Sequence, residues 1–459
     1  MAFRSRRALW AALLTLVLAG PLHAQHFPST EQLRSIIQSR VDEGRAVGIV
    51  LGVMEADGST RIVTAGEAGP VAHPLGERSV FEIGSITKVF TGILLADMVQ
   101  RGEVLLNDPV SKYLPTDVTM PSRNGREITL LDLSTHRSAL PRLPSNMAPK
   151  DASNPYADYT VDQLYVFLSS HQLRRDIGSQ YEYSNLAVGL LGHVLGRVAG
   201  MSYEDLVRSR ILAPLGMTMS GITLTPEMQD WMVAGHNQSR AVVPLWDLPT
   251  FAGAGALRSS TLDMFRFLAA NLGPPEGDLE KATRASHIPH REAGPQMQVG
   301  LNWHVQAVGN RRIIWHNGGT GGFRTFIGFD PDEGVGVVVL TNSTHGADDI
   351  GFHLINTTLP LTEPPREHIA IEVDAKILAD YVGEYQVAPA LSFVITLEDD
   401  GLQMQPTGQP KAPIFPESEN EFFLRVVDAQ ITFQRDSTGA VTGLVLHQGG
   451  QNVPGRKVK

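Results

Sequence analysis

The chain has 459 residues, 42% of them hydrophobic and 19% charged, so disorder, collagen and coiled coil are excluded as overall descriptions and two or three compact units are expected. It contains no cysteine, which excludes disulfides, a thiol nucleophile and Cys-ligated metals, so any nucleophile must be a hydroxyl, a carboxylate or an amine. A formal charge of −10 gives no broad attraction for nucleic acid or for an anionic membrane.

Residues 1–24 have the pattern of a secretory signal peptide. Three arginines precede the apolar run Ala8–Leu18, and Leu22-His23-Ala24 offers a small-residue cleavage site. The run is too short to span a bilayer, and no later segment approaches 18 consecutive apolar residues. We therefore expect an exported protein, periplasmic or secreted, without a membrane span. The adjacent Arg6 and Arg7 leave Sec and twin-arginine export both open.

In the region that follows, segments of strand character at both sequence ends flank a helical middle. This pattern predicts an α+β domain over residues 25–358, with a sheet completed by distant segments and an inserted helical region. The expected elements are a helix at Thr30–Glu43, hairpin strands at Val47–Met54 and Arg61–Ala65, a helix buried nearly all round at Thr87–Gln100, helices at Val161–Ser169, Asn185–Ala199, Tyr203–Ile211 and Thr261–Asn271, and strands at Arg312–Trp315, Thr325–Asp330 and Val335–Thr341.

The C-terminal part of the chain has a different pattern. Three prolines within Leu359–Glu367 predict a linker, which we place at residues 359–374. Beyond it, apolar residues alternate with polar ones along Leu391–Leu397, and Asp400-Gly401 supplies a turn. Residues 375–459 are therefore expected to form a separate small all-β domain.

Ser85 and Lys88 are the first candidates for chemistry. Three residues apart at the start of a buried helix, they share one helix face. A buried lysine can lose its proton near neutral pH and then accept the serine proton. The free N–H groups at a helix start also stabilise negative charge on an attacked carbonyl. The alternative is that Ser85 caps the helix and that Lys88 is solvated.

Two further segments carry residues of the right chemical type. Tyr183 could shuttle a proton and Asn185 could orient a substrate amide, or the two could simply pack and cap a helix. The glycine-rich run Trp315–Phe323 follows an expected strand, and one of its backbone N–H groups could form half of an oxyanion hole. Alternatively, this run could be a hairpin connection.

Taken together, these segments resemble the active-site elements of the penicillin-recognising serine hydrolases, most nearly the class C β-lactamase-related proteins. The resemblance covers about residues 30–358, while residues 375–459 resemble the lipocalin-like β domain that some of these hydrolases carry. The motifs that carry it, in chain order, are Ser85-x-x-Lys88, Tyr183-x-Asn185 and His316-x-Gly318.

The resemblance implies a β-lactamase-like antiparallel sheet flanked by helices and a covalent acyl-enzyme mechanism that uses no cofactor and no metal. Ser85 would be the acylated nucleophile and Lys88 its activator. Tyr183 would share in proton transfer to the leaving group or from the deacylating water. Asn185 would bind the substrate's amide, and the N–H groups of Ser85 and Gly319 would form the oxyanion hole.

The third motif also implies substrate contacts for His316 and Gly318, but it departs from the family pattern. Class C β-lactamases have Lys-Thr-Gly where this chain has His316-Asn317-Gly318. A lysine is a fixed positive charge that suits the carboxylate of a β-lactam, whereas a histidine with an ordinary pKa of about 6.5 is mostly neutral at pH 7. Histidine at this position resembles D-aminopeptidases, other D-specific peptidases and related carboxylesterases.

We therefore expect an exported serine hydrolase that acts on amide, peptide or ester bonds, with a peptidase or esterase favoured over a true β-lactamase. The other alternative is a non-catalytic penicillin-binding-like sensor, from which an enzyme would be distinguished by turnover after acylation. The expected partner is a small-molecule or peptide substrate, not nucleic acid. The loops Pro141–Tyr159 and Gly273–Pro295 are expected to decide specificity. The D or L preference, the role of the β domain and the oligomeric state stay open.

Overall fold

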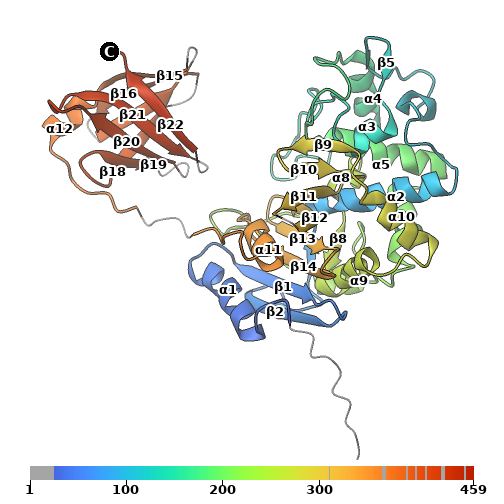
Figure 1. Cartoon of the computed structure of the whole chain (residues 1–459). Coiled ribbons are helices and arrows are strands. Elements are labelled where there is room, and N and C mark those ends of the chain that lie inside the picture. Colours follow the sequence, from blue (N-terminus) through green and yellow to red (C-terminus); the bar gives the residue numbers. More distant parts are fainter. Residues whose placement is uncertain are drawn as a thin grey trace, which may run out of the picture. The chain divides into compact units, whose positions relative to one another are not determined.

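The computed structural model describes residues 25–309, 311–363, 368–388, 391–398, 401–408, 411–424, 429–448 and 451–459. The predicted signal peptide lies outside these residues. The chain divides into two compact units, Met1–Thr362 and Glu363–Lys459 (Figure 1).

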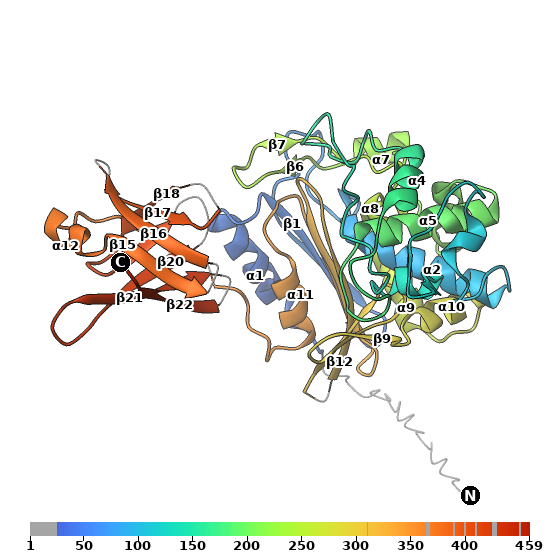
Figure 2. The same ribbon diagram turned by 90° about the horizontal axis from the view of Figure 1, so that it is seen from above.

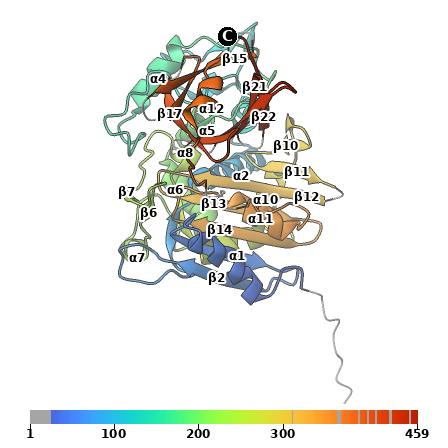
Figure 3. The same cartoon turned by 90° about the vertical axis from the view of Figure 1, so that its left-hand side faces the viewer.

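The first unit is built on an eight-stranded antiparallel sheet with the order β2-β1-β14-β13-β12-β11-β10-β9 (Figure 3). Segments from the two ends of the unit meet where β1 pairs with β14, and Val50 lies opposite Leu340. Every residue of these two strands is buried, as expected for strands covered on both faces. The strands are β1 Gly48–Met54, β2 Thr60–Gly66, β9 Arg291–Gly294, β10 Met297–Val299, β11 His304–Val308, β12 Arg311–Gly319, β13 Arg324–Asp330 and β14 Val335–Thr341.

Helices cover both faces of this sheet (Figure 2). One face carries α1 Thr30–Asp42 and α11 Asp348–Ile355. The other face carries the helical region, with α2 Thr87–Gln100, α3 Leu130–Ser134, α4 Val161–Ser170, α5 Asn185–Ala199, α6 Tyr203–Val207, α7 Pro226–Asp230, α8 Ala252–Gly255, α9 Thr261–Leu272 and α10 Asp278–Ser286. The predicted α+β class, with a helix-flanked sheet and an inserted helical region, is confirmed.

Short elements connect the helical region to the sheet. A 3-10 turn, Gly84–Ile86, precedes α2, and nearly all of α2 is buried, as predicted. Other single turns are Val110–Tyr113 and the π-helical Arg208–Leu212. Three two-stranded pairs complete the unit, namely β3 Val80–Glu82 with β8 Arg258–Ser260, β4 Ser122–Arg123 with β5 Arg126–Glu127, and β6 Gly235–His236 with β7 Val242–Val243.

The second unit is a closed barrel of β15 to β22, preceded by α12. Side chains fill its interior: Tyr381 stacks on Phe433 with ring centroids 4.1 Å apart, and the hydroxyl of Tyr385 donates to the Tyr381 carbonyl oxygen. A barrel of eight strands is just wide enough for such filling. The all-β prediction is confirmed, while the lipocalin-like resemblance stays a prediction. The elements are α12 Ala375–Asp380, β15 Gly383–Ala388, β16 Leu391–Glu398, β17 Gly401–Pro406, β18 Ala412–Pro416, β19 Glu421–Leu424, β20 Ala429–Arg435, β21 Val441–Gln448 and β22 Gln451–Lys457.

Within the residues that the structure describes, no single helix has both the length and the apolar composition needed to cross a membrane. Among the described residues, α5 taken together with Tyr203–Leu212 meets both criteria, and that pair is bent by 78°. Most residues of α5 are buried inside the first unit, as in the core helix of a globular domain.

Candidate active site

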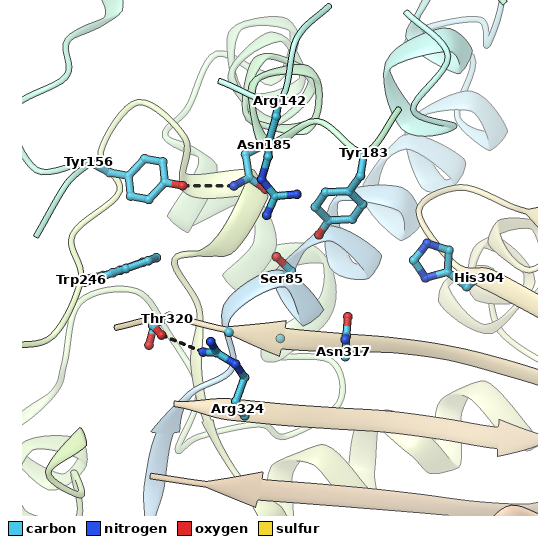
Figure 4. Close-up of a pocket in the computed structure, with 12 residues that line it drawn as sticks. Ser85, Arg142, Tyr156, Tyr183, Asn185, Trp246, His304, Asn317, Thr320 and Arg324 are labelled. Carbon is cyan, nitrogen blue, oxygen red and sulfur yellow. Dashed lines mark hydrogen bonds between the residues drawn. The ribbon is translucent and has the colours of Figure 1, made fainter. Parts of the chain in front are cut away.

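A pocket of about 460 Å³ lies between β12 and the helical region (Figure 4). Residues from all three predicted motifs line it, namely Ser85, Tyr183, Asn185, Asn317, Gly318 and Gly319. Thr320, from the same glycine-rich run as Gly319, also lines it, and the rest of its wall lies outside the predicted segments and consists of Arg142, Tyr156, Trp246, His304 and Arg324. Folding therefore brings the three sequence elements into one cavity. Of the two loops expected to decide specificity, Pro141–Tyr159 contributes two lining residues and Gly273–Pro295 contributes none of those described.

Ser85 sits in the tight turn before α2, where two glycines bring this turn against strand β12. Gly84 has a positive φ of 51°, and a Cβ built on it would lie 2.6 Å from the backbone nitrogen of Gly319. A Cβ on Gly318 would lie 2.0 Å from the Ile83 carbonyl oxygen. Only glycine fits such approaches. They bring the backbone of Gly319 against the turn that carries Ser85, and both residues line the pocket, while the oxyanion hole formed by their N–H groups stays a prediction.

Lys88 is fully buried beneath Ser85. Its Nζ lies 2.9 Å from the Ser85 Oγ and donates to the Ala254 carbonyl oxygen at 2.6 Å. Among the described residues, no carboxylate lies within ion-pair distance of it. Burial, aided by the positive charge of Arg142, holds the pKa of Lys88 well below 10.5. The alternative that Lys88 is solvated is therefore wrong, and its amine is poised to accept the serine proton.

Tyr183 completes the reactive group. Its hydroxyl points toward Ser85 (Figure 4), and the Nζ of Lys88 and the guanidinium carbon of Arg142 lie 4.9 Å and 5.2 Å from its ring centroid. Burial raises the pKa of Tyr183, and this outweighs the opposing effects of the Ser85 side chain and the Arg142 charge. The side chain is thus a phenol at neutral pH. It can donate a proton to a leaving group, while Lys88, whose lowered pKa favours the neutral amine, is the one of the two that is available as a base.

Asn185 presents an amide to the pocket. Ser184, not Asn185, is the N-cap of α5, because its hydroxyl accepts from the Ala187 N–H at 2.9 Å. The Asn185 Nδ2 donates to the Tyr156 hydroxyl at 3.1 Å, while its Oδ1 is buried without a partner among the described residues (Figure 4). That oxygen is an available acceptor, and an amide N–H of a substrate would satisfy it.

His316 is placed differently from the other motif residues. It is 0% exposed and is not one of the described residues that line the pocket. The neighbouring His304, from β11, lines the pocket instead. The two imidazole centroids are 5.0 Å apart, and the His316 Nδ1 lies 2.6 Å from the Asn317 carbonyl oxygen. Burial, with the nearby charges of His304 and Lys88, lowers the pKa of His316 well below 6.5. His316 is therefore neutral at pH 7, and its direct contact with substrate stays a prediction.

Trp246 is one of the residues that line the pocket. Its indole N–H donates to the Ser153 carbonyl oxygen at 2.9 Å, and Asn154 and Asp247 exchange hydrogen bonds beside it. These contacts join two loops that are distant in sequence. Periodicity and spacing carry no signal for such a pairing, which is why Trp246 and Tyr156 could not be predicted as pocket residues.

A family model described as Beta-lactamase matches residues 33–357. The chain belongs to the β-lactamase family. Its members act as serine hydrolases, which is consistent with Ser85, Lys88 and Tyr183 meeting in one pocket. A second family model, described as a domain of unknown function, DUF3471, matches residues 367–456.

Relatives within the β-lactamase family include peptidases and penicillin-binding proteins. The D-alanyl-D-alanine-carboxypeptidase/endopeptidase AmpH of Escherichia coli (strain K12) is 32% identical over 362 residues, which covers 74% of this chain and 92% of that protein. Penicillin-binding protein 4* of Bacillus subtilis (strain 168) is 25% identical over 406 residues, covering 83% and 88%. A class C β-lactamase structure from Rhodobacter sphaeroides superposes with a TM-score of 0.63 at 25% identity, over 72% of this chain and 100% of that one.

Proposed function

We propose that this protein is an exported serine peptidase that cleaves peptides at D-alanine through an acyl-enzyme, in preference to β-lactams. The observation that carries the proposal is the neutral, buried His316 at the position where class C β-lactamases have a lysine, beside a complete Ser85–Lys88–Tyr183 group. The similarity to a D-alanyl-D-alanine-carboxypeptidase/endopeptidase over most of both chains supports it.

In the first half of the reaction, the neutral Lys88 amine takes the Ser85 proton as the oxygen attacks the scissile carbonyl. The N–H groups of Ser85 and Gly319 stabilise the oxyanion. Tyr183 donates a proton to the departing amine, because burial keeps its hydroxyl protonated. Loss of the amine leaves an ester on Ser85.

In the second half, water attacks the ester carbonyl and gives up its proton to the group that lost one. Tyr183 is that group if it protonated the leaving amine, and its hydroxyl points toward Ser85 (Figure 4). The Ser85 oxygen leaves and regains its proton from Lys88, 2.9 Å away. Enzyme and acid product are then restored, with no net change in protons on the three side chains.

The test is release of D-alanine from a peptide ending in D-Ala-D-Ala, run beside a chromogenic cephalosporin, with Ser85→Ala as the blank and Ser239→Ala, an exposed serine outside the pocket, as the matched control. We expect peptide turnover with a higher kcat/KM than cephalosporin turnover, and loss of both in Ser85→Ala only. Faster hydrolysis of the cephalosporin would favour a β-lactamase. Acylation without turnover of either substrate would favour a penicillin-binding-like sensor.

Export is part of the same proposal and rests on the charged, apolar and small-residue pattern of residues 1–24. N-terminal sequencing of protein from the periplasm or medium tests it, with Gln25 as the expected first residue. A Lys-Lys pair in place of Arg6-Arg7 would block the twin-arginine route and leave the Sec route working. Full-length protein retained inside the cell would contradict export.

A further inference from the structure

Two guanidinium groups line the pocket, and they differ in their hydrogen bonds and in the charges close to them. Arg324 donates to the carbonyl oxygens of Thr320 and Phe323 at 2.9 Å and 2.8 Å, and the nearby carboxylate of Asp348 partly balances its charge. Arg142 is exposed at the opposite wall, with its guanidinium carbon 5.2 Å from the Tyr183 ring centroid (Figure 4). Within the described part of the chain, no carboxylate forms an ion pair with Arg142.

The other described residues that line the pocket carry no negative charge that would neutralise Arg142. None of the described residues that line the pocket is an aspartate or a glutamate. Lys88 lies beneath Ser85, and its Nζ is already within hydrogen-bond distance of the Ser85 Oγ and the Ala254 carbonyl oxygen. Burial lowers the pKa of His304 to about 4, so this imidazole is neutral. A chain of net charge −10 thus keeps a local positive field at its reactive serine.

We propose that Arg142 binds a carboxylate group of the substrate and so supplies the fixed positive charge that His316 does not. This inference rests on the proposed function and names the recognition element of that same site. A guanidinium offers a planar pair of N–H donors that matches a carboxylate, and the pairing is strongest where water is partly excluded. Asn185 lines the same pocket as Arg142 (Figure 4), and its buried Oδ1 has no hydrogen-bond partner among the described residues. Together they would hold an amide and an acid of one substrate.

The carboxylate could belong to the acyl half of the substrate or to its leaving half, and two substrate pairs separate these sources. The first pair is N-succinyl- and N-acetyl-D-alanine p-nitrophenyl ester, which differ only by a carboxylate in the acyl half. The second is a D-Ala-D-Ala peptide and its C-terminal amide, which differ in the leaving half. For each pair, the ratio of kcat/KM for the acid to kcat/KM for the neutral partner is measured in wild type, Arg142→Gln, Arg142→Lys and Arg324→Gln.

We expect Arg142→Gln to lower this ratio at least ten-fold for one pair, mainly through KM, with partial recovery in Arg142→Lys, which keeps the charge but loses the fork. Arg324→Gln is expected to affect the acid and neutral members of each pair alike, because its Nη1 is bound to two backbone carbonyls and the carboxylate of Asp348 partly balances its charge. A merely structural role for Arg142 would likewise lower both members equally.

Equal losses for acid and neutral substrates in both pairs would overturn the inference, and so would a larger change of ratio in Arg324→Gln than in Arg142→Gln. Failure of the proposed function is seen separately. If wild type hydrolyses the esters through Ser85 but releases no D-alanine from peptides, the peptidase assignment falls, and the ester pair still decides the role of Arg142. If wild type turns over neither pair, both proposals fall.

Discussion

Glu82 and Arg258 face each other across the short β3–β8 pair, and together they hold the backbone of Trp246 at both of its polar groups. Glu82 Oε1 accepts the Trp246 N–H at 2.8 Å, and the Arg258 Nη2 donates to the Trp246 carbonyl oxygen at 2.9 Å and to Glu82 Oε1 at 3.3 Å. Both charged side chains are buried. A buried ion pair, one member of which lies three residues before Ser85, thus holds the backbone of a residue that lines its pocket.

Glu82→Gln tests how much the Glu82–Arg258 ion pair contributes to stability, because glutamine has nearly the same shape as glutamate but no charge. The change leaves the buried Arg258 with only the exposed carboxylate of Asp247, whose Oδ1 lies 3.7 Å from its Nη2, so we expect the free energy of unfolding in urea to fall by about 2 kcal/mol. Glu227→Gln is the matched control, since the side chains of Glu227 and its partner Arg78 are both exposed and neither lines the pocket. Unfolding of Glu82→Gln at the wild-type urea concentration would show that the pair contributes nothing to stability.

The pH dependence of catalysis follows from Lys88. The reactive form is the neutral amine, and burial lowers its pKa from 10.5, so activity is present above the lowered pKa and is lost as the pH falls through it. The charge of Arg142 is the second cause of that lowering. We therefore expect Arg142→Gln to move the acid limb of kcat/KM for N-acetyl-D-alanine p-nitrophenyl ester to higher pH. A limb that stays in place or moves to lower pH would contradict this electrostatic coupling.

We also expect the buried Lys88 to lower the free energy of unfolding at neutral pH. Because its pKa is lower in the folded than in the unfolded chain, the unfolded chain binds more protons between the two values, and stability rises with pH across that window. Each unit of difference is worth about 1.4 kcal/mol. At pH 7, Lys88→Met should abolish turnover and raise the free energy of unfolding by about 1 kcal/mol or more, whereas Lys150→Met, at an exposed position, should do neither. A less stable Lys88→Met protein would refute this account.

Truncation should separate the two units. Leu359 and Leu361 pack on the core beneath α1 and α11, and Arg45 donates to the Thr362 carbonyl oxygen at 3.1 Å. A chain ending at Thr362 is therefore expected to fold and to react at Ser85 with a fluorophosphonate label at the wild-type rate. A chain ending at residue 358 lacks these contacts and should be less stable by about 2 kcal/mol, by the burial of two leucines. Aggregation of the 362-residue form would contradict independent folding.

The parts of the site that could be predicted from sequence are those set by local geometry. Ser85 and Lys88 are fixed by one helix turn, and the buried pattern of α2 is visible in its composition. Arg142 and Trp246 could not be predicted in this way, because each belongs to an irregular loop whose position depends on partners distant in sequence. His316 shows the intermediate case: its motif position was readable, but its burial behind Tyr183 and His304 depends on how β12 packs.

The last prediction concerns two neighbouring glycines that carry different constraints. A Cβ at position 318 would lie 2.0 Å from the backbone oxygen of Ile83, so Gly318→Ala must push β12 away from the Ser85 turn. A Cβ at 319 would meet only the flexible end of Arg324, at 2.9 Å. Separation of β12 from the turn would spoil the oxyanion hole, and loss of one of its donors costs about 100-fold to 1,000-fold in kcat.

We therefore expect Gly318→Ala to lower kcat by about 100-fold or more, and Gly319→Ala to lower it by less than about 10-fold, because the guanidinium can swing aside. Steady-state kinetics with a neutral p-nitrophenyl ester measures both, and near-ultraviolet circular dichroism checks that each variant is folded. The order matters more than the size. If Gly319→Ala lowered kcat more than Gly318→Ala, the position of the Gly319 N–H would depend on the packing of Arg324 and not on the approach of β12 to Ile83.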